Sequence, residues 1–140
     1  MTSPIPAHDQ TDSHKYTVHY PAHAPRPGDP HYPEFEAYRR RTHATAQCAF
    51  AVKTGNGAEC KGAMELHHSH IEFSFQNGVD FKELEKQYPG ISNPNQVGSW
   101  IESAENLEWL CEWHHRGHGG KHVAAAADYE GEQFVRNLIS

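Results

Sequence analysis

The 140-residue sequence has no long hydrophobic run, few cysteines, and fewer basic than acidic side chains. No apolar stretch approaches the ~18 residues that a membrane-spanning helix needs, and nothing resembles a signal peptide. We therefore expect a soluble, cytoplasmic protein without a membrane partner. The cysteine count is three, an odd number that does not suggest a disulfide framework. Reduced thiolates beside thirteen histidines suggest a metal instead.

Positive charge is scarce, with 12 Lys and Arg against 18 Asp and Glu and a formal net charge of -6. Proteins that bind the phosphate backbone usually carry a basic surface, so this balance disfavours tight DNA binding without excluding it. The basic residues are concentrated between positions 35 and 62, a segment that contains five basic residues and only two glutamates. They are Arg39, Arg40, Arg41, Lys53 and Lys61.

Hydrophobic residues are also scarce at 36%, which predicts that part of the chain joins no core. Seven of the nine prolines lie before residue 34. We interpret residues 1–32 as a disordered arm rich in proline and histidine. Residues 33–140 are then long enough for one modest domain.

The patterns within this domain predict short helices and strands of mixed α and β type. The sequence "YPEFEAYRRRT" has an early proline and late arginines, which favour a helix near 33–44. Asp80 is a suitable N-cap for a helix of about ten residues. The other expected elements are a turn or knuckle around Gly55, Asn56 and Gly57, a strand within 63–73, a loop over 91–100, a glycine-rich turn over 116–122 and a helix over 128–139.

Two histidine-rich segments carry the chemical signal. The first is "ELHHSH" at residues 65–70, and the second is "NLEWLCEWHH" at residues 106–115. Together with Cys48 and Cys60 upstream, they resemble the HNH endonucleases, also called His-Me finger or ββα-metal nucleases. The resemblance covers about residues 48–122. Within the family, the chain is similar to small stand-alone members from actinobacteria and their phages.

The resemblance implies an α+β fold with a ββα-metal core, a structural zinc knuckle and flanking helices. It implies that His67 and His115 bind a catalytic divalent cation, such as Mg, Mn, Ni or Zn, and that His68 is the general base. Asn106 would hold the connecting loop and so orient the base. A neutral imidazole suits both the ligand role and the base role.

A structural zinc site is also implied, with Cys48, Cys60, Cys111 and His114 as a tetrahedral Cys3His ligand set. The common form of this knuckle uses two C-x-x-C pairs. Here eleven residues separate Cys48 from Cys60, so the upstream pair departs from that form. Buried free cysteines are the alternative interpretation.

Several assignments stay open at this stage. Neighbours on a regular strand face opposite sides, so His67 and His68 can serve one site only at a strand end or bulge. His70 shares a face with His68 and is a reserve candidate. His114 and His118 are four residues apart, the spacing of one helical face, and form a second candidate ligand pair. Arg116 is a candidate for clamping phosphate or for capping a helix, and the three tryptophans are more often core than base-stacking.

The expected function is metal-dependent hydrolysis of DNA phosphodiester bonds. A zinc-stabilised adaptor that binds nucleic acid or protein on the same fold is the main alternative, and it fits the net acidity better. A zinc deaminase is disfavoured because the proline of its P-C-x-x-C motif is missing. The insertion between His70 and Asn106 is a candidate contact for a second copy of the chain, as in a homodimer, or for a phage or host protein.

Overall fold

The computed structural model describes residues 3–11, 17–55, 57–117, 121–122, 129 and 134. Within these ranges the chain is mixed α+β, with a two-stranded antiparallel sheet, which confirms the predicted class at this level. The elements are the 3-10 helices η1 (Arg26–Gly28), η2 (His43–Thr45) and η3 (Phe73–Gly78), the helices α1 (Tyr32–Thr42), α2 (Ala49–Thr54), α3 (Phe81–Gln87), α4 (Pro94–Ile101) and α5 (Glu112–Arg116), and the strands β1 (Met64–His68) and β2 (Leu107–Cys111).

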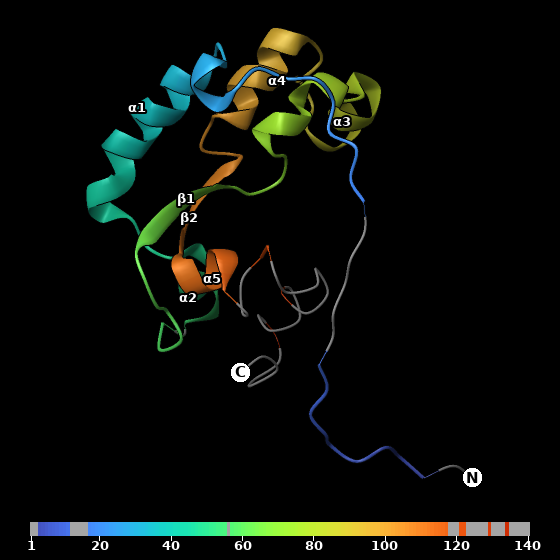
Figure 1. The fold of residues 1–140 in the computed structure, drawn as a ribbon, viewed down its shortest axis with the longest axis vertical. Helices are drawn as coiled ribbons and strands as arrows, with labels where there is room; N and C mark the ends of the chain where they lie inside the picture. The colour runs from blue at the N-terminus through green and yellow to red at the C-terminus, as the bar shows by residue number, and fades with distance from the viewer. Residues whose placement is uncertain are drawn as a thin grey trace.

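The two strands form the centre of the molecule. β1 pairs with β2 so that Met64 lies opposite Cys111 and His68 opposite Leu107. α5 begins at the residue after β2, so the second strand leads directly into a helix. Figure 1 shows α3 and α4 on one side of this sheet and α2 and α5 on the other.

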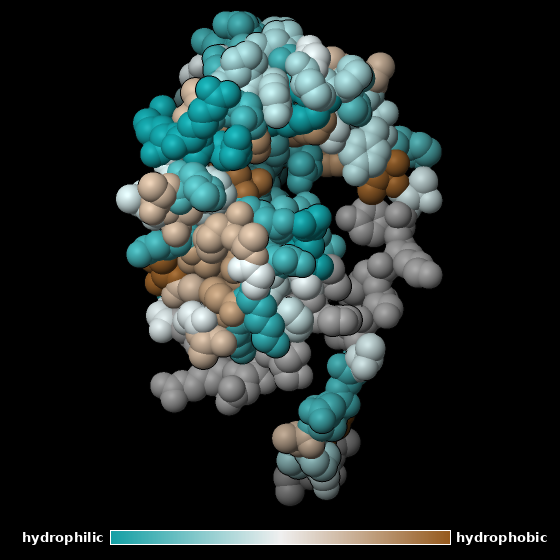
Figure 2. Space-filling model, turned by 60° about the vertical axis from the view of Figure 1, so that its left-hand side comes forward, coloured by the Kyte–Doolittle hydropathy of each residue, from teal (hydrophilic) through white to brown (hydrophobic). Residues whose placement is uncertain are grey.

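Two separate groups of buried side chains flank the sheet. One joins α3 and α4 and contains Leu84, Ile91, Val97, Trp100 and Ile101. The other contains Cys48, Phe50, Leu110 and Cys111. On the face drawn in Figure 2, hydrophilic residues cover most of the upper part, and more hydrophobic residues gather at the lower left. Burial of apolar area in two small cores holds each side of the sheet.

The predicted helices near 33–44 and after Asp80 are confirmed as α1 and α3. α1 has a proline in its first turn and three arginines in its last. Asp80 caps α3 because its side chain accepts hydrogen bonds from the backbone N–H groups of Lys82 and Glu83. Local signals were therefore sufficient for both helices.

The predicted loop over 91–100 is wrong, because α4 occupies most of it. Asn93 caps this helix by accepting from the backbone N–H of Gln96, and Pro94 lies in the first turn. Gly98, within this helix, is needed for packing. A Cβ there would lie 2.3 Å from Cδ2 of His31.

The remaining predictions differ in extent. The strand expected within 63–73 is the shorter β1, and the first arm of the predicted knuckle is the helix α2, which ends at Gly55 with φ of 70°. Glycine adopts this left-handed conformation without strain and ends the helix here. Asn56, at the centre of the predicted turn, lies outside the described residues. The helix predicted over 128–139 lies outside the described residues except for 129 and 134.

Part of the segment interpreted as a disordered arm packs against the domain. Asp29 is buried, and its carboxylate accepts hydrogen bonds from the backbone of His31 and the side chain of Gln76. Arg26 reaches Glu102 at the end of α4. Within the described ranges, each helix is too short or too polar to cross a bilayer.

Candidate metal centres

Cys48, Cys60, Cys111 and His114 come together as predicted, and we call them the Cys3His cluster. They arrive from the start of α2, the loop before β1, the end of β2 and α5. Nδ1 of His114 lies 3.5 Å, 3.7 Å and 3.2 Å from the three sulfurs, in chain order. In a tetrahedral zinc site with Zn–S of about 2.3 Å and Zn–N of about 2.0–2.1 Å, sulfur and nitrogen lie about 3.5 Å apart. The cluster can therefore hold a metal such as zinc.

His114 is fixed for this role by its surroundings. Its ring is almost fully buried and stacks on Phe50 at a centroid distance of 4.3 Å. Burial lowers the pKa of the ring, which keeps the imidazole neutral and able to bind a cation. Its Nε2 lies 3.6 Å from a carboxylate oxygen of Glu59, a residue that sequence reasoning missed. This separation is too long for a direct hydrogen bond, so Glu59 contributes a nearby negative charge and not a hydrogen-bond partner for the ring.

The thiols differ in acidity. Burial, together with neighbouring Cys111 and Cys48, raises the pKa of Cys60 to about 12. Burial alone would also raise the pKa of Cys111, but backbone N–H groups of His114 and Lys61 lower it below its ordinary value. Three thiols packed together resist joint ionisation. A cation removes that conflict, so metal binding releases protons at this cluster.

A second group, the three-histidine cluster, contains His67, His115 and His122. The predicted pair His67 and His115 meets with ring centroids 4.7 Å apart. His122 joins them because the chain after α5 turns back, with its backbone N–H donating to the carbonyl of His115. Nε2 of His122 and Nε2 of His115 are 3.1 Å apart, close to the ~3.3 Å of two nitrogens on a tetrahedral metal.

The ring nitrogens of this cluster suit a ligand role. Nε2 of His67 is buried and has no hydrogen-bond partner among the described residues. Burial, and then the charge of His115, lowers the pKa of His67 to about 2. Nδ1 of His115 lies 3.0 Å from Glu65, whose other oxygen pairs with Arg116. This carboxylate leaves Nε2 of His115 free for a cation.

His68 lies beside this cluster and faces the opposite side of β1, as strand geometry requires. Nε2 of His68 is 2.9 Å from Glu102, and its ring stacks on Phe35. The carboxylate of Glu72 lies between the two sites, 3.7 Å from Nδ1 of His68 and 3.9 Å from Nε2 of His122. Because His68 ends β1, its second nitrogen can still face the cluster.

Asn106 is fully buried and ties together the chain that follows His68. Its side-chain oxygen accepts from the backbone N–H groups of His70 and Ile71, and its amide donates to the carbonyls of Ile71 and Ile101. Its own carbonyl accepts from the N–H of Ser69. These contacts match the loop-holding role expected for it.

Other candidate residues lie elsewhere. His70 packs on Tyr88 and Trp100, away from the three-histidine cluster. Trp100 and Trp109 are buried, in keeping with a core role. His118 lies outside the described residues. Arg116 pairs with Glu65 at the end of α5.

Comparison of the chain with protein-family models, with curated proteins and with solved structures gives no match.

Proposed function

We propose that this protein is a metal-dependent endonuclease of HNH type, built on a ββα-metal core with a structural zinc. One observation carries the proposal. Three imidazoles whose nitrogens point at one another lie beside a fourth, His68, that is held separately by a carboxylate. A hydrolytic metal site needs these two kinds of histidine, ligand and base, next to each other.

The catalytic cation would be held by His67, His115 and His122. Bound there, it would stabilise the charge that develops on the scissile phosphate. His68 would take a proton from the attacking water, and Asn106 would keep the loop after His68 in place. Three imidazoles without a carboxylate ligand favour Zn or Ni over Mg and Mn, which prefer oxygen ligands.

DNA as the substrate is supported by basic and aromatic side chains near α5. An open pocket of about 420 Å³ is lined by Lys61, Gly62, Glu112, Trp113, Arg116 and Gly117. The ammonium of Lys61 lies 4.8 Å from the centre of the Trp113 ring. Lys and Arg beside the proposed site could contact phosphates on either side of the scissile bond.

The test is nicking of supercoiled plasmid by the zinc-loaded protein with added Mg, Mn, Ni or Zn. The wild type should nick DNA. His68→Ala should lower the rate about 10²- to 10⁴-fold, the usual contribution of a general base, while keeping its zinc. His19→Ala, a substitution of an exposed histidine, is the matched control and should be fully active.

A zinc-stabilised adaptor is the second candidate. The net charge of -6 favours it, as do the carboxylates of Glu65, Glu72 and Glu102 around the histidines, because all of these repel phosphate. A wild type that is inert with every metal but still retards DNA, or binds a partner protein, would establish the adaptor and refute the nuclease.

A further inference from the structure

Glu102 is the least exposed charged side chain in contact with the proposed base. Its side chain is 1% exposed, and it lies just after α4. One carboxylate oxygen is 2.9 Å from Nε2 of His68, and the other is 2.7 Å from a guanidinium nitrogen of Arg26. A buried carboxylate needs such partners, because burial of an unpaired charge is costly.

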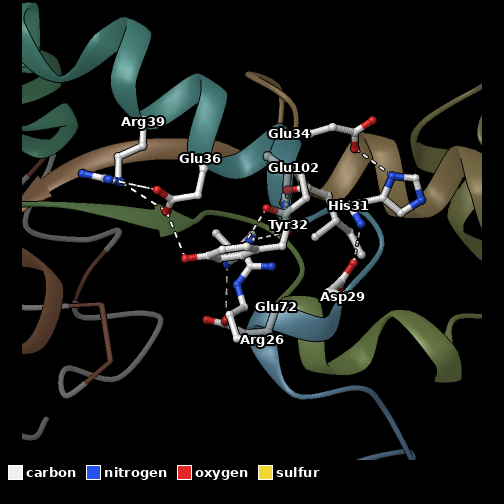
Figure 3. Close-up of polar contacts among 12 residues, drawn as sticks. Arg26, Asp29, His31, Tyr32, Glu34, Glu36, Arg39, Glu72 and Glu102 are labelled. Atoms are coloured by element: carbon white, nitrogen blue, oxygen red, sulfur yellow. Dashed lines mark hydrogen bonds and ion pairs between the residues drawn. The ribbon is translucent and has the colours of Figure 1, made fainter.

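Arg26 is itself held in a defined position by aromatic rings. Its guanidinium carbon lies 5.0 Å from the ring centre of Tyr32 and 4.5 Å from those of Phe35 and Phe73. Figure 3 shows Arg26 against the ring of Tyr32, with Glu102 close by. Stacking of this kind orients a guanidinium and excludes water from its ion pair.

The same rings also contact His68. Phe35 stacks on the imidazole at 5.5 Å, and Phe73 lies at 6.2 Å. The arginine, the carboxylate and the histidine therefore share one aromatic enclosure, although Arg26 is 76 residues from Glu102 in the chain. Such an arrangement defines which nitrogen of His68 meets the carboxylate.

A carboxylate paired with Arg26 can only accept a hydrogen bond, so the nitrogen that faces it must carry the proton. We propose that Arg26 and Glu102 are positioning residues that hold His68 in the tautomer protonated on Nε2. Nδ1 is then the unprotonated nitrogen, on the side of Glu72 and the three-histidine cluster. Its distance of 3.7 Å from Glu72 is too long for a direct hydrogen bond.

The consequence for catalysis rests on the proposed function, whereas the tautomer does not. In that reaction one proton would pass from water to Nδ1, and the hydroxide would attack phosphorus as the P–O3′ bond breaks. Solvent would protonate the leaving oxygen, and His68 would return its proton to solvent. Glu102 would stay ionised throughout and stabilise the imidazolium, as the buried carboxylate does in a serine protease triad.

The deciding measurement is a long-range ¹H–¹⁵N correlation NMR spectrum of the zinc-loaded wild type, without other metals, under conditions where the ring is neutral. Signals of His68 are assigned by their loss in His68→Ala. We expect protonated Nε2 and unprotonated Nδ1 as the dominant form. A dominant Nδ1–H form in the wild type would overturn the proposal; the tautomer is measured in the wild type, and His68→Ala serves only to assign the signals.

Substitution then tests the role of the carboxylate. Glu102→Gln is nearly isosteric but can donate as well as accept, so it should raise the population of the Nδ1–H tautomer. If the wild type nicks DNA, Glu102→Gln should lower kcat about 10²- to 10⁴-fold with little change in KM. Glu102→Asp, which keeps the charge, should restore part of both signals, and unchanged tautomer populations in Glu102→Gln would refute the role. Zinc content and melting temperature serve as checks of folding.

The outcomes separate the two proposals. An inert wild type with the expected tautomer would refute the nuclease and keep the positioning arrangement. An active wild type with the opposite tautomer would support the nuclease and refute the positioning role of Arg26 and Glu102. Arg26→Lys keeps the positive charge but loses the flat surface that stacks on the rings, and it should shift the tautomer less than Glu102→Gln does.

Discussion

Stability at mildly acidic pH should depend on His67. Burial lowers its pKa to about 2 in the folded chain, whereas an unfolded histidine has a pKa near 6.5. Between these values the unfolded chain binds more protons, so the free energy of unfolding falls as the pH falls below about 6.5. At pH 5 the difference of about 1.5 pH units corresponds to a loss of about 2 kcal/mol from this residue.

The assay is urea unfolding of the protein with zinc in the Cys3His cluster and no metal in the three-histidine cluster, at pH 7.5 and pH 5. His67→Gln removes the titrating group from nearly the same space. The wild type should lose about 2 kcal/mol more than His67→Gln between the two pH values. Protonation of the Cys3His cluster affects both proteins and cancels in the difference. Equal losses in the two proteins would refute the burial argument for His67.

Three further predictions follow from the clusters. Cys48→Ser should release the zinc of the Cys3His cluster and unfold the α2 side of the molecule, as measured by metal analysis and circular dichroism, and a variant with the same zinc content as the wild type would contradict the ligand set. Glu65→Gln should weaken Ni²⁺ binding at the three-histidine cluster about 10- to 100-fold by calorimetry, and unchanged affinity would exclude a supporting role for this carboxylate. Asn106→Ala leaves the N–H groups of His70 and Ile71 without their acceptor and should lower the free energy of unfolding by about 2–5 kcal/mol, whereas a loss below about 1 kcal/mol would mean that other groups replace it.

Local signals in the sequence predicted much of the fold. Asp80 has a side chain that caps a helix, and the arginines at the end of α1 follow a rule of the same short range. The segment over 91–100 was predicted as a loop although local signals for a helix, Asn93 as N-cap and Pro94 in the first turn, were present. Gly98 within that helix packs against His31, which is 67 positions away and cannot be found from a local pattern.

In the candidate site, too, residues within the two motifs were predicted and residues brought in by tertiary contacts were not. The resemblance of the two motifs to the HNH endonucleases pointed to His67, His68, Asn106 and His115, and to the cysteines. His122 was missed because no motif marks it. Its backbone N–H donates to the carbonyl of His115, and that of Lys121 donates to the carbonyl of His114, which holds these two residues against α5. A histidine seven residues after a proposed ligand was the available signal.

Glu102 and Arg26 gave no such signal. Glu102 precedes Asn106 by four residues in an acidic stretch that resembles solvated surface, and Arg26 lies among prolines. Their pairing depends on burial by three aromatic rings, two from α1 and one from η3. Burial of a charge is a tertiary property that single-sequence reasoning does not reach.

The opposite facing of His67 and His68 on β1 limits how this gene can change length. Insertion of one residue between Met64 and His67 would exchange the sides that the two histidines face, or break the pairing of Leu66 with Trp109. Such an insertion would inactivate both rings at once. The loop between Gly55 and Cys60 carries no such constraint on parity, so length variants in related chains should accumulate there and be absent from the strand.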